Sequence, residues 1–380
     1  MNSVRIYLNK ARKEYKSRNY EDSLKIFNKL HDEYSDEFKI NDLITYSWAI
    51  YQVHVKDFLD ENYLFEAVEF ITGLIQQGDL NQANTCPYTF SVLKVMDYLY
   101  YEKDYFDLEE WLGKIDPLLL DEKSSGNYPS RREKYYNYAS KTYLECGEFE
   151  KCIKISKDAL VNLTSFTNDN ETWFKWRMAK SLGHLNRHQE ALNYLKEVFK
   201  VRRDWYVKKE FAENYIALGN MDKSLKYLGE AVLTNDPSSK KVNVYYLIYQ
   251  ILNESQPYIA FKHVELYYLL KSEKYAFIPD EVKDLDIDDD LDKNEIDDEI
   301  RRYWYDKIYN RKLEYGTVCE LLDDDSGFIV SHNLESVYFN KDDFDGDYIK
   351  EGMYVSFLIE RSFEESLNKE VIKAVDIKEE

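Results

Sequence analysis

The sequence is poor in helix-breaking residues and in long apolar runs. Only 12 Gly and 6 Pro occur in 380 residues, as expected for long helices joined by short turns. No run of 18 apolar residues is present, which argues against a transmembrane helix. The first residues, MNSVRIYLNKARKEYK, lack the apolar core of a signal peptide. We therefore expect a soluble, cytoplasmic and mostly helical protein.

Patterns that would indicate catalysis or metal binding are also missing. The sequence has no G-x-S-x-G, no glycine-rich phosphate loop and no H-E-x-x-H. The four cysteines show no paired metal-ligand spacing, and their positions on apolar patterns suggest packed thiols (Cys86, Cys146, Cys152 and Cys319). We predict a protein that is not an enzyme and that holds no cofactor or metal.

Acidic and basic side chains are distributed unevenly along the chain. The formal net charge is −21, which argues against nucleic-acid binding over the whole surface. Residues 131–209 nevertheless carry 17 basic and 10 acidic side chains, whereas residues 280–300 carry 2 and 12 and residues 313–380 carry 6 and 18. A basic middle is therefore followed by an acidic linker and an acidic end.

Three adjacent stretches share a pattern of two amphipathic helices around a short turn. They are EKYYNYASKTYLECGEFEKCIKISKDAL, FKWRMAKSLGHLNRHQEALNYLKEVF and KKEFAENYIALGNMDKSLKYLGEAV. In each, a small residue on the first helix precedes a large residue, a Gly or Asn that can adopt the left-handed conformation, and a small residue on the second helix. These positions are Ser140, Tyr143, Gly147 and Cys152, then Ala179, Leu182, Asn186 and Ala191, then Ala212, Tyr215, Gly219 and Ser224.

This order resembles the tetratricopeptide repeat, a helix-turn-helix unit of 34 residues. Weaker matches to the small residue of the second helix fall at Ser23, Ala67, Leu108 and Ala260. The resemblance implies an all-α helical-repeat solenoid of about seven helix pairs, of which three are good repeats and four are degenerate. We place the solenoid at residues 1–279.

In this family the first helices build a concave surface that binds an extended peptide or a partner helix. Carried over by register, the resemblance places a basic groove with interleaved aromatic residues on these helices, formed by Arg12, Lys16, Lys134, Asn137, Lys141, Trp176, Arg177, Lys180, Lys208 and Lys209. The same pattern also fits ordinary solvated helix faces. If it is a site, an acidic peptide or a phosphate backbone would suit it.

The segment 280–300, DEVKDLDIDDDLDKNEIDDEI, is a charge run with sparse aliphatic residues. We predict an acidic linker, disordered or loosely helical, that could lie in the basic groove and mask it. Residues 301–312 then form a connecting helix rich in basic and aromatic residues.

From residue 313 to residue 380 the pattern changes to short β-rich runs. EYGTVCELL, GFIVSH, SVYFN, MYVSFLIE and EVIKAVDIK predict a small five-stranded β-barrel. Gly327-Phe328-Ile329 and Val337-Tyr338-Phe339 within these runs resemble a cold-shock domain, an oligonucleotide-binding (OB) barrel. The resemblance implies base stacking by Phe328 and Tyr338. Asn340 and Lys341 stand where the family has His and Phe, and the first strand has no aromatic residue at Cys319-Glu320-Leu321.

Two functions therefore remain open. The first is a non-enzymatic adaptor that binds an acidic or amphipathic protein segment in the basic groove, with the barrel as an accessory module. The second is a single-stranded RNA- or DNA-binding protein of a bacterial regulatory or defence assembly. Each base–aromatic stack contributes only about 1–3 kcal/mol, and the acidic barrel repels phosphates, which favours the adaptor. Self-association through the ends of the solenoid is a third possibility.

Overall fold

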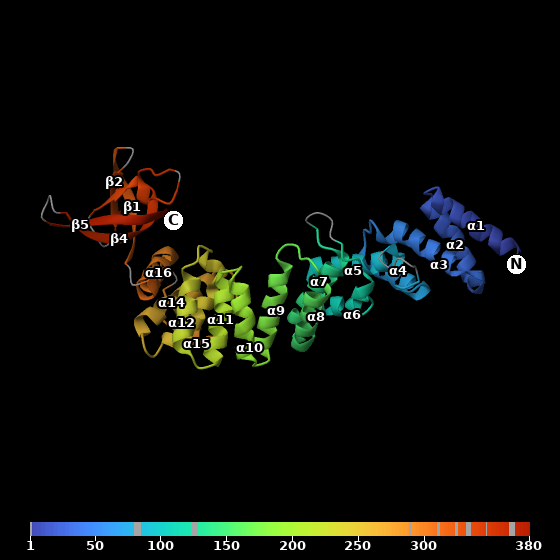
Figure 1. Cartoon of the computed structure of the whole chain (residues 1–380), viewed down its shortest axis with the longest axis horizontal. Helices are drawn as coiled ribbons and strands as arrows, with labels where there is room; N and C mark the ends of the chain where they lie inside the picture. The colour runs from blue at the N-terminus through green and yellow to red at the C-terminus, as the bar shows by residue number, and fades with distance from the viewer. Residues whose placement is uncertain are drawn as a thin grey trace. The chain divides into compact units, whose positions relative to one another are not determined.

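A computed structural model describes the chain at residues 2–79, 85–123, 128–288, 290–309, 312–323, 326–331, 336–346, 348–364 and 369–380. The chain forms two compact units, Met1–Val198 and Phe199–Glu380. Most of the described chain is helical, and its five strands lie at the end of the second unit (Figure 1).

The first unit is built from consecutive helical hairpins. Its helices are α1 (Asn2–Lys16), α2 (Tyr20–Tyr34), α3 (Ile40–Ile50), α4 (Glu61–Leu74), α5 (Pro87–Glu102), α6 (Tyr105–Leu112), α7 (Arg131–Glu145), α8 (Phe149–Asn162), α9 (Asn170–His184) and α10 (His188–Phe199). Helix α3 continues into a π-helical turn over Tyr51–Val55. One apolar core runs from Val4 to Phe174 through most of these helices.

Small residues let the two helices of a hairpin approach closely. The Ser23 hydroxyl donates to the Ala11 carbonyl at 2.9 Å, and the Cys152 thiol donates to the Ser140 carbonyl at 3.2 Å. The turn residues adopt the left-handed conformation, with φ of 77° at Gly147. These contacts follow from the repeat pattern, because a larger side chain would hold the helices apart.

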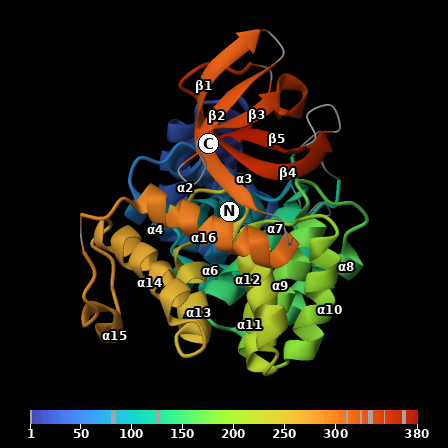
Figure 2. The ribbon, with the colours of Figure 1, turned by 90° about the vertical axis from the view of Figure 1, so that its left-hand side faces the viewer.

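The described part of the second unit contains two further helical hairpins and two more α-helices before its barrel. The hairpins are α11 (Trp205–Ala217) with α12 (Met221–Val232) and α13 (Val242–Leu252) with α14 (Pro257–Ser272), and the other two helices are α15 (Asp280–Lys283) and α16 (Lys293–Tyr309). Helix α16 packs on α12 and α14 on one side and contacts the barrel on the other (Figure 2). Its buried residues Ile296, Ile300 and Trp304 belong to the core of this unit.

The structure differs from the predicted linker at its second half. Helix α16 begins at Lys293, inside the segment 280–300, and not near residue 301. Val282 is buried as well, so aliphatic residues anchor this acidic segment to the core of its own unit. Asp289, Asn310 and Arg311 lie outside the described residues. The division of the chain at residues 279, 300 and 312 remains a prediction.

The barrel is closed by five strands, β1 (Leu313–Asp323), β2 (Ser326–Ser331), β3 (Val337–Asn340), β4 (Tyr354–Glu364) and β5 (Lys369–Glu379). The strand order is β1-β2-β3-β5-β4, with β3 and β5 parallel and the other pairs antiparallel. Alternating side chains such as Val318, Ile329 and Phe357 fill its interior.

The predicted fold class, helical repeats followed by a five-stranded barrel, is therefore confirmed. The cold-shock resemblance of that barrel remains a prediction. Within the described residues, no helix has the length and apolar character needed to cross a bilayer.

Candidate partner-binding surfaces

Three first helices of the first unit, α5, α7 and α9, contact one another through polar and aromatic side chains. The rings of Tyr100 on α5 and Tyr138 on α7 stack with centroids 4.0 Å apart. The guanidinium of Arg177 on α9 donates from Nη1 to the Ser140 hydroxyl on α7 at 2.9 Å. The three helices therefore present their side chains to one continuous region.

Arg177 is the most unusual charge in this region. Only 7% of the residue is exposed, and it forms no ion pair with a carboxylate in the described part of the unit. Burial lowers the pKa of Arg177. The Glu145 carboxylate opposes this shift from beyond ion-pair distance. An arginine withdrawn from water without a direct carboxylate partner costs on the order of several kcal/mol, so the position favours an added negative charge.

Lysines extend the positive charge around Arg177. Burial lowers the pKa of Lys141, and repulsion from Arg177, Lys103 and Lys180 lowers it further, while Glu145 opposes the shift. Lys141 lies over the Tyr105 ring at 5.9 Å, and Lys180 over the Trp176 ring at 5.3 Å. We call this set the basic–aromatic surface: Tyr100, Lys103, Tyr105, Tyr138, Lys141, Trp176, Arg177 and Lys180.

Two other predicted groove residues, Lys134 and Asn137, also lie on α7. Lys134 pairs with Asp97 at 2.5 Å, and the same carboxylate accepts from the Tyr138 hydroxyl. Asn137, one turn further along α7, is half-buried. The Lys134 charge is therefore largely neutralised where it stands.

The two residues predicted on α1 differ in their surroundings. Arg12 pairs at 2.5 Å with the fully buried carboxylate of Asp42, which also accepts from Arg5 at 2.9 Å. Lys16 is exposed at the end of the helix. Arg12 therefore balances a buried charge, because an unpaired carboxylate there would be costly.

Lys208 and Lys209 belong to the second unit. Lys208 donates to the Glu230 carbonyl at 3.2 Å, and burial lowers its pKa. Lys209 pairs with Glu213 at 2.5 Å, one turn along α11. Both ammonium groups therefore have partners inside their own unit.

The predicted stacking residues of the barrel lie side by side on strands β2 and β3. Phe328 and Tyr338 are register partners, and their half-buried rings meet edge to face with centroids 5.8 Å apart. The Tyr338 hydroxyl donates to Asn340 at 2.6 Å, while Lys341 is exposed in the short helical turn that follows. The two rings form a pair, flanked by Glu320 opposite Phe328.

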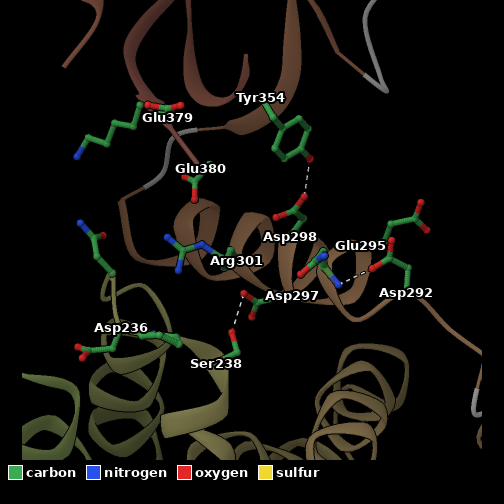
Figure 3. Close-up of a pocket in the computed structure, with 14 residues that line it drawn as sticks. Asp236, Ser238, Asp292, Glu295, Asp297, Asp298, Arg301, Tyr354, Glu379 and Glu380 are labelled. Carbon is green, nitrogen blue, oxygen red and sulfur yellow. Dashed lines mark hydrogen bonds between the residues drawn. The ribbon is translucent and has the colours of Figure 1, made fainter. Parts of the chain in front are cut away.

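A cavity of about 740 Å³ in the second unit lies between α16, the connection from α12 to α13, and the barrel (Figure 3). Its polar contacts join these parts: Tyr354 donates to Asp298 at 2.6 Å, and Ser238 donates to Asp297 at 2.8 Å. Arg301 donates to the Tyr315 hydroxyl at 3.0 Å. Burial raises the pKa of Asp298. Asp298 therefore joins α16 to the barrel, whereas Asp297 joins it to the connection between α12 and α13.

The described residues contain no group of three or more His, Cys, Asp or Glu side chains placed to hold a metal ion. Burial raises the pKa of Cys86, Cys146 and Cys152, so these thiols are protonated at neutral pH and are poor nucleophiles.

Sequence reasoning missed Tyr100, Lys103, Tyr105 and Tyr138 as members of the basic–aromatic surface. Tyr100 and Tyr105 flank the turn of a degenerate repeat whose register mark is Leu108. The left-handed turn at Lys103, with φ of 62°, has no Gly or Asn to mark it.

No protein-family model matches the chain, and no curated protein matches its sequence. Similar solved structures include a Rap protein complexed with Competence and Sporulation Factor, at 11% identity and a TM-score of 0.38 over 80% of this chain and 81% of that one. A tetratricopeptide repeat protein from Parabacteroides merdae has 12% identity and a TM-score of 0.36 over 74% and 97%. The human IFIT1 dimer with PPP-AAAA has 13% identity and a TM-score of 0.37 over 74% and 61%.

Proposed function

We propose that the protein is a non-enzymatic adaptor that binds an acidic or amphipathic segment of a partner protein on the basic–aromatic surface. The observation that supports this most is Arg177, a buried cation without a carboxylate partner in the described part of its unit. A carboxylate from a partner would compensate its charge in a place where water does so poorly.

The surrounding aromatic rings add apolar area to this charge. The half-buried Tyr100 ring stacks on the buried Tyr138 ring, and the Trp176 ring lies beneath Lys180. Aromatic residues and arginine are the side chains that most often dominate binding energy at protein interfaces. Lysines at the margin would mainly raise the association rate.

A titration with two short labelled peptides tests this function. One peptide alternates Glu and Leu, and the other alternates Lys and Leu. We expect fluorescence anisotropy to show binding of the acidic peptide that weakens as salt is added. Lys141→Glu combined with Lys180→Glu should weaken it about tenfold, because two favourable charge interactions become repulsive.

The matched control reverses Lys154 and Lys157, two exposed lysines on the second helix α8. Lys154→Glu with Lys157→Glu changes the net charge by the same amount away from the surface. An equal loss of affinity in both double variants would mean that only the overall charge matters, and the proposed site would be abandoned.

Nucleic-acid binding by the barrel is the second candidate. Its support is the paired arrangement of Phe328 and Tyr338 on neighbouring strands, since two adjacent rings can stack two bases. Phe328→Ala with Tyr338→Ala should then remove binding of labelled single-stranded RNA or DNA, measured over a salt series. Retained affinity in this variant would exclude the ring pair as the site.

A further inference from the structure

A second groove in the first unit is lined mainly by second helices of the hairpins, unlike the basic–aromatic surface. It has a volume of about 520 Å³ and is lined by α2, α4 and the end of α3 with its π-helical turn. Helices α2 and α4 are second helices of their hairpins, whereas α5, α7 and α9 are first helices. The two surfaces therefore use different residues.

Aromatic side chains line this groove and remain partly open to solvent. Tyr63 is 64% exposed and Phe70 is 42% exposed, and Phe70 rests edge to face on Tyr46 with centroids 5.8 Å apart. Large apolar side chains gathered in one concave place are typical of an interaction site. The groove therefore offers apolar area that the unit itself does not cover.

The π-helical turn shapes one wall of the groove. The Lys56 amide donates to the Tyr51 carbonyl at 2.8 Å, one residue further than in an α-helix. The extra residue changes the direction of the side chains in and after the turn. One residue of the turn, His54, lines the groove. π-Helical turns are rare in proteins overall, and those that occur are often found at functional sites.

The charge of the groove is negative. Asp32 and Glu66 line it, and neither forms an ion pair within the described part of the first unit. Residues 20–79 carry 13 acidic and 4 Lys or Arg side chains. Asp32 and Tyr46 both line the groove, and burial together with the Asp32 carboxylate raises the pKa of Tyr46. A positive partner would meet both features.

We propose that this acidic–aromatic groove binds a basic amphipathic segment, in which leucine-like side chains enter between Tyr63 and Phe70 while Lys or Arg side chains pair with Asp32 and Glu66. The site is separate from the proposed function, because it has the opposite charge and its own residues. A chain with both surfaces would hold an acidic and a basic segment at the same time.

The Lys-Leu peptide is the probe for this groove. We expect it to bind, and Asp32→Lys with Glu66→Lys to weaken it about tenfold through two reversed charge interactions. The matched control is Glu33→Lys with Glu69→Lys, which changes exposed residues of the same two helices outside the groove lining. The control should change the affinity less than about twofold.

Tyr63→Ala separates apolar contact from charge. The side chain is mostly exposed, so its loss should leave the melting temperature unchanged and still weaken the Lys-Leu peptide several-fold. The Lys141→Glu and Lys180→Glu variant should bind this peptide normally, which keeps the test independent of the basic–aromatic surface.

Two results would overturn the proposal. One is the absence of any binding by the Lys-Leu peptide to the intact chain. The other is an equal effect of the groove pair and the control pair, because that would reduce the interaction to the general negative charge of residues 20–79.

Discussion

The indole ring of Trp304 on α16 occupies the space that a side chain at Gly229 on α12 would need. A Cβ atom at position 229 would lie 2.2–2.8 Å from three atoms of that ring. The same indole donates from Nε1 to Nε2 of the buried His263 on α14 at 2.8 Å. Helix α16 is thus fixed to two helices through one side chain.

Gly229→Ala should destabilise the second unit by about 1–3 kcal/mol, because the added methyl group must displace a ring held on all sides. Urea unfolding monitored by tryptophan fluorescence measures the loss. Gly73→Ala is the control, since a Cβ there meets nothing within 4 Å and alanine favours a helix by about 0.5–1 kcal/mol. A stable Gly229→Ala protein would show that α16 does not need this contact.

His263 should make the second unit sensitive to acid. Burial lowers the pKa of His263 to about 4, below its ordinary value of about 6.5. Between pH values of about 6.5 and 4 the imidazole is therefore protonated in the unfolded chain but neutral in the folded unit. The free energy of unfolding should fall by about 2–3 kcal/mol as the pH drops through this range. Protonation would also remove the acceptor of the Trp304 indole.

The unfolding free energy of the wild type and of His263→Leu, measured by urea titration at several pH values, checks this expectation. Other groups contribute equally to both proteins, so the difference between the two slopes isolates the histidine. Parallel curves would assign the acid sensitivity of the unit to its carboxylates.

Arg177→Met should separate binding from stability. The substitution replaces a buried charge by an apolar side chain of similar size, so stability should stay the same or rise by about 1–3 kcal/mol. Affinity for the Glu-Leu peptide should fall at least several-fold in the anisotropy titration. A large drop in melting temperature would instead identify Arg177 as a structural residue.

Arg12→Ala should lower stability without weakening peptide binding. It leaves the buried Asp42 carboxylate with Arg5 as its remaining cation partner among the described residues, and stability should fall by about 1–3 kcal/mol. The Glu-Leu peptide should bind unchanged. Lys16→Ala, at an exposed position on the same helix, should alter stability by less than about 0.5 kcal/mol. Weaker peptide binding by the Arg12→Ala variant would mean that Arg12 contributes to the binding site, as the sequence predicts.

The hairpins can be predicted from the sequence because their requirements are local. Gly147, Asn186 and Gly219 all adopt positive φ, which few other residues tolerate. The start of α16 also leaves a signal, the four-residue spacing of Ile296, Ile300 and Trp304. The dense charge around these residues conceals that spacing.

Contacts between repeats are not local and leave weaker traces. Arg12 meets Asp42, and Tyr100 meets Tyr138, only because separate helices pack together. A helix register tells which face a side chain occupies but does not identify its neighbour on another helix. The charge of a predicted groove residue can therefore be cancelled by a carboxylate that the pattern does not reveal.

The parallel pairing of β3 with β5 determines when the barrel can be completed during synthesis. The helical hairpins use contacts between neighbouring segments and can form as soon as each pair leaves the ribosome. Strand β3 ends at Asn340 and its parallel partner β5 begins only at Lys369. Until β5 has been synthesised, the free edge of β3 can pair with other chains. The helices on which α16 rests are complete by that stage, so the nascent barrel strands emerge beside a surface that is already folded.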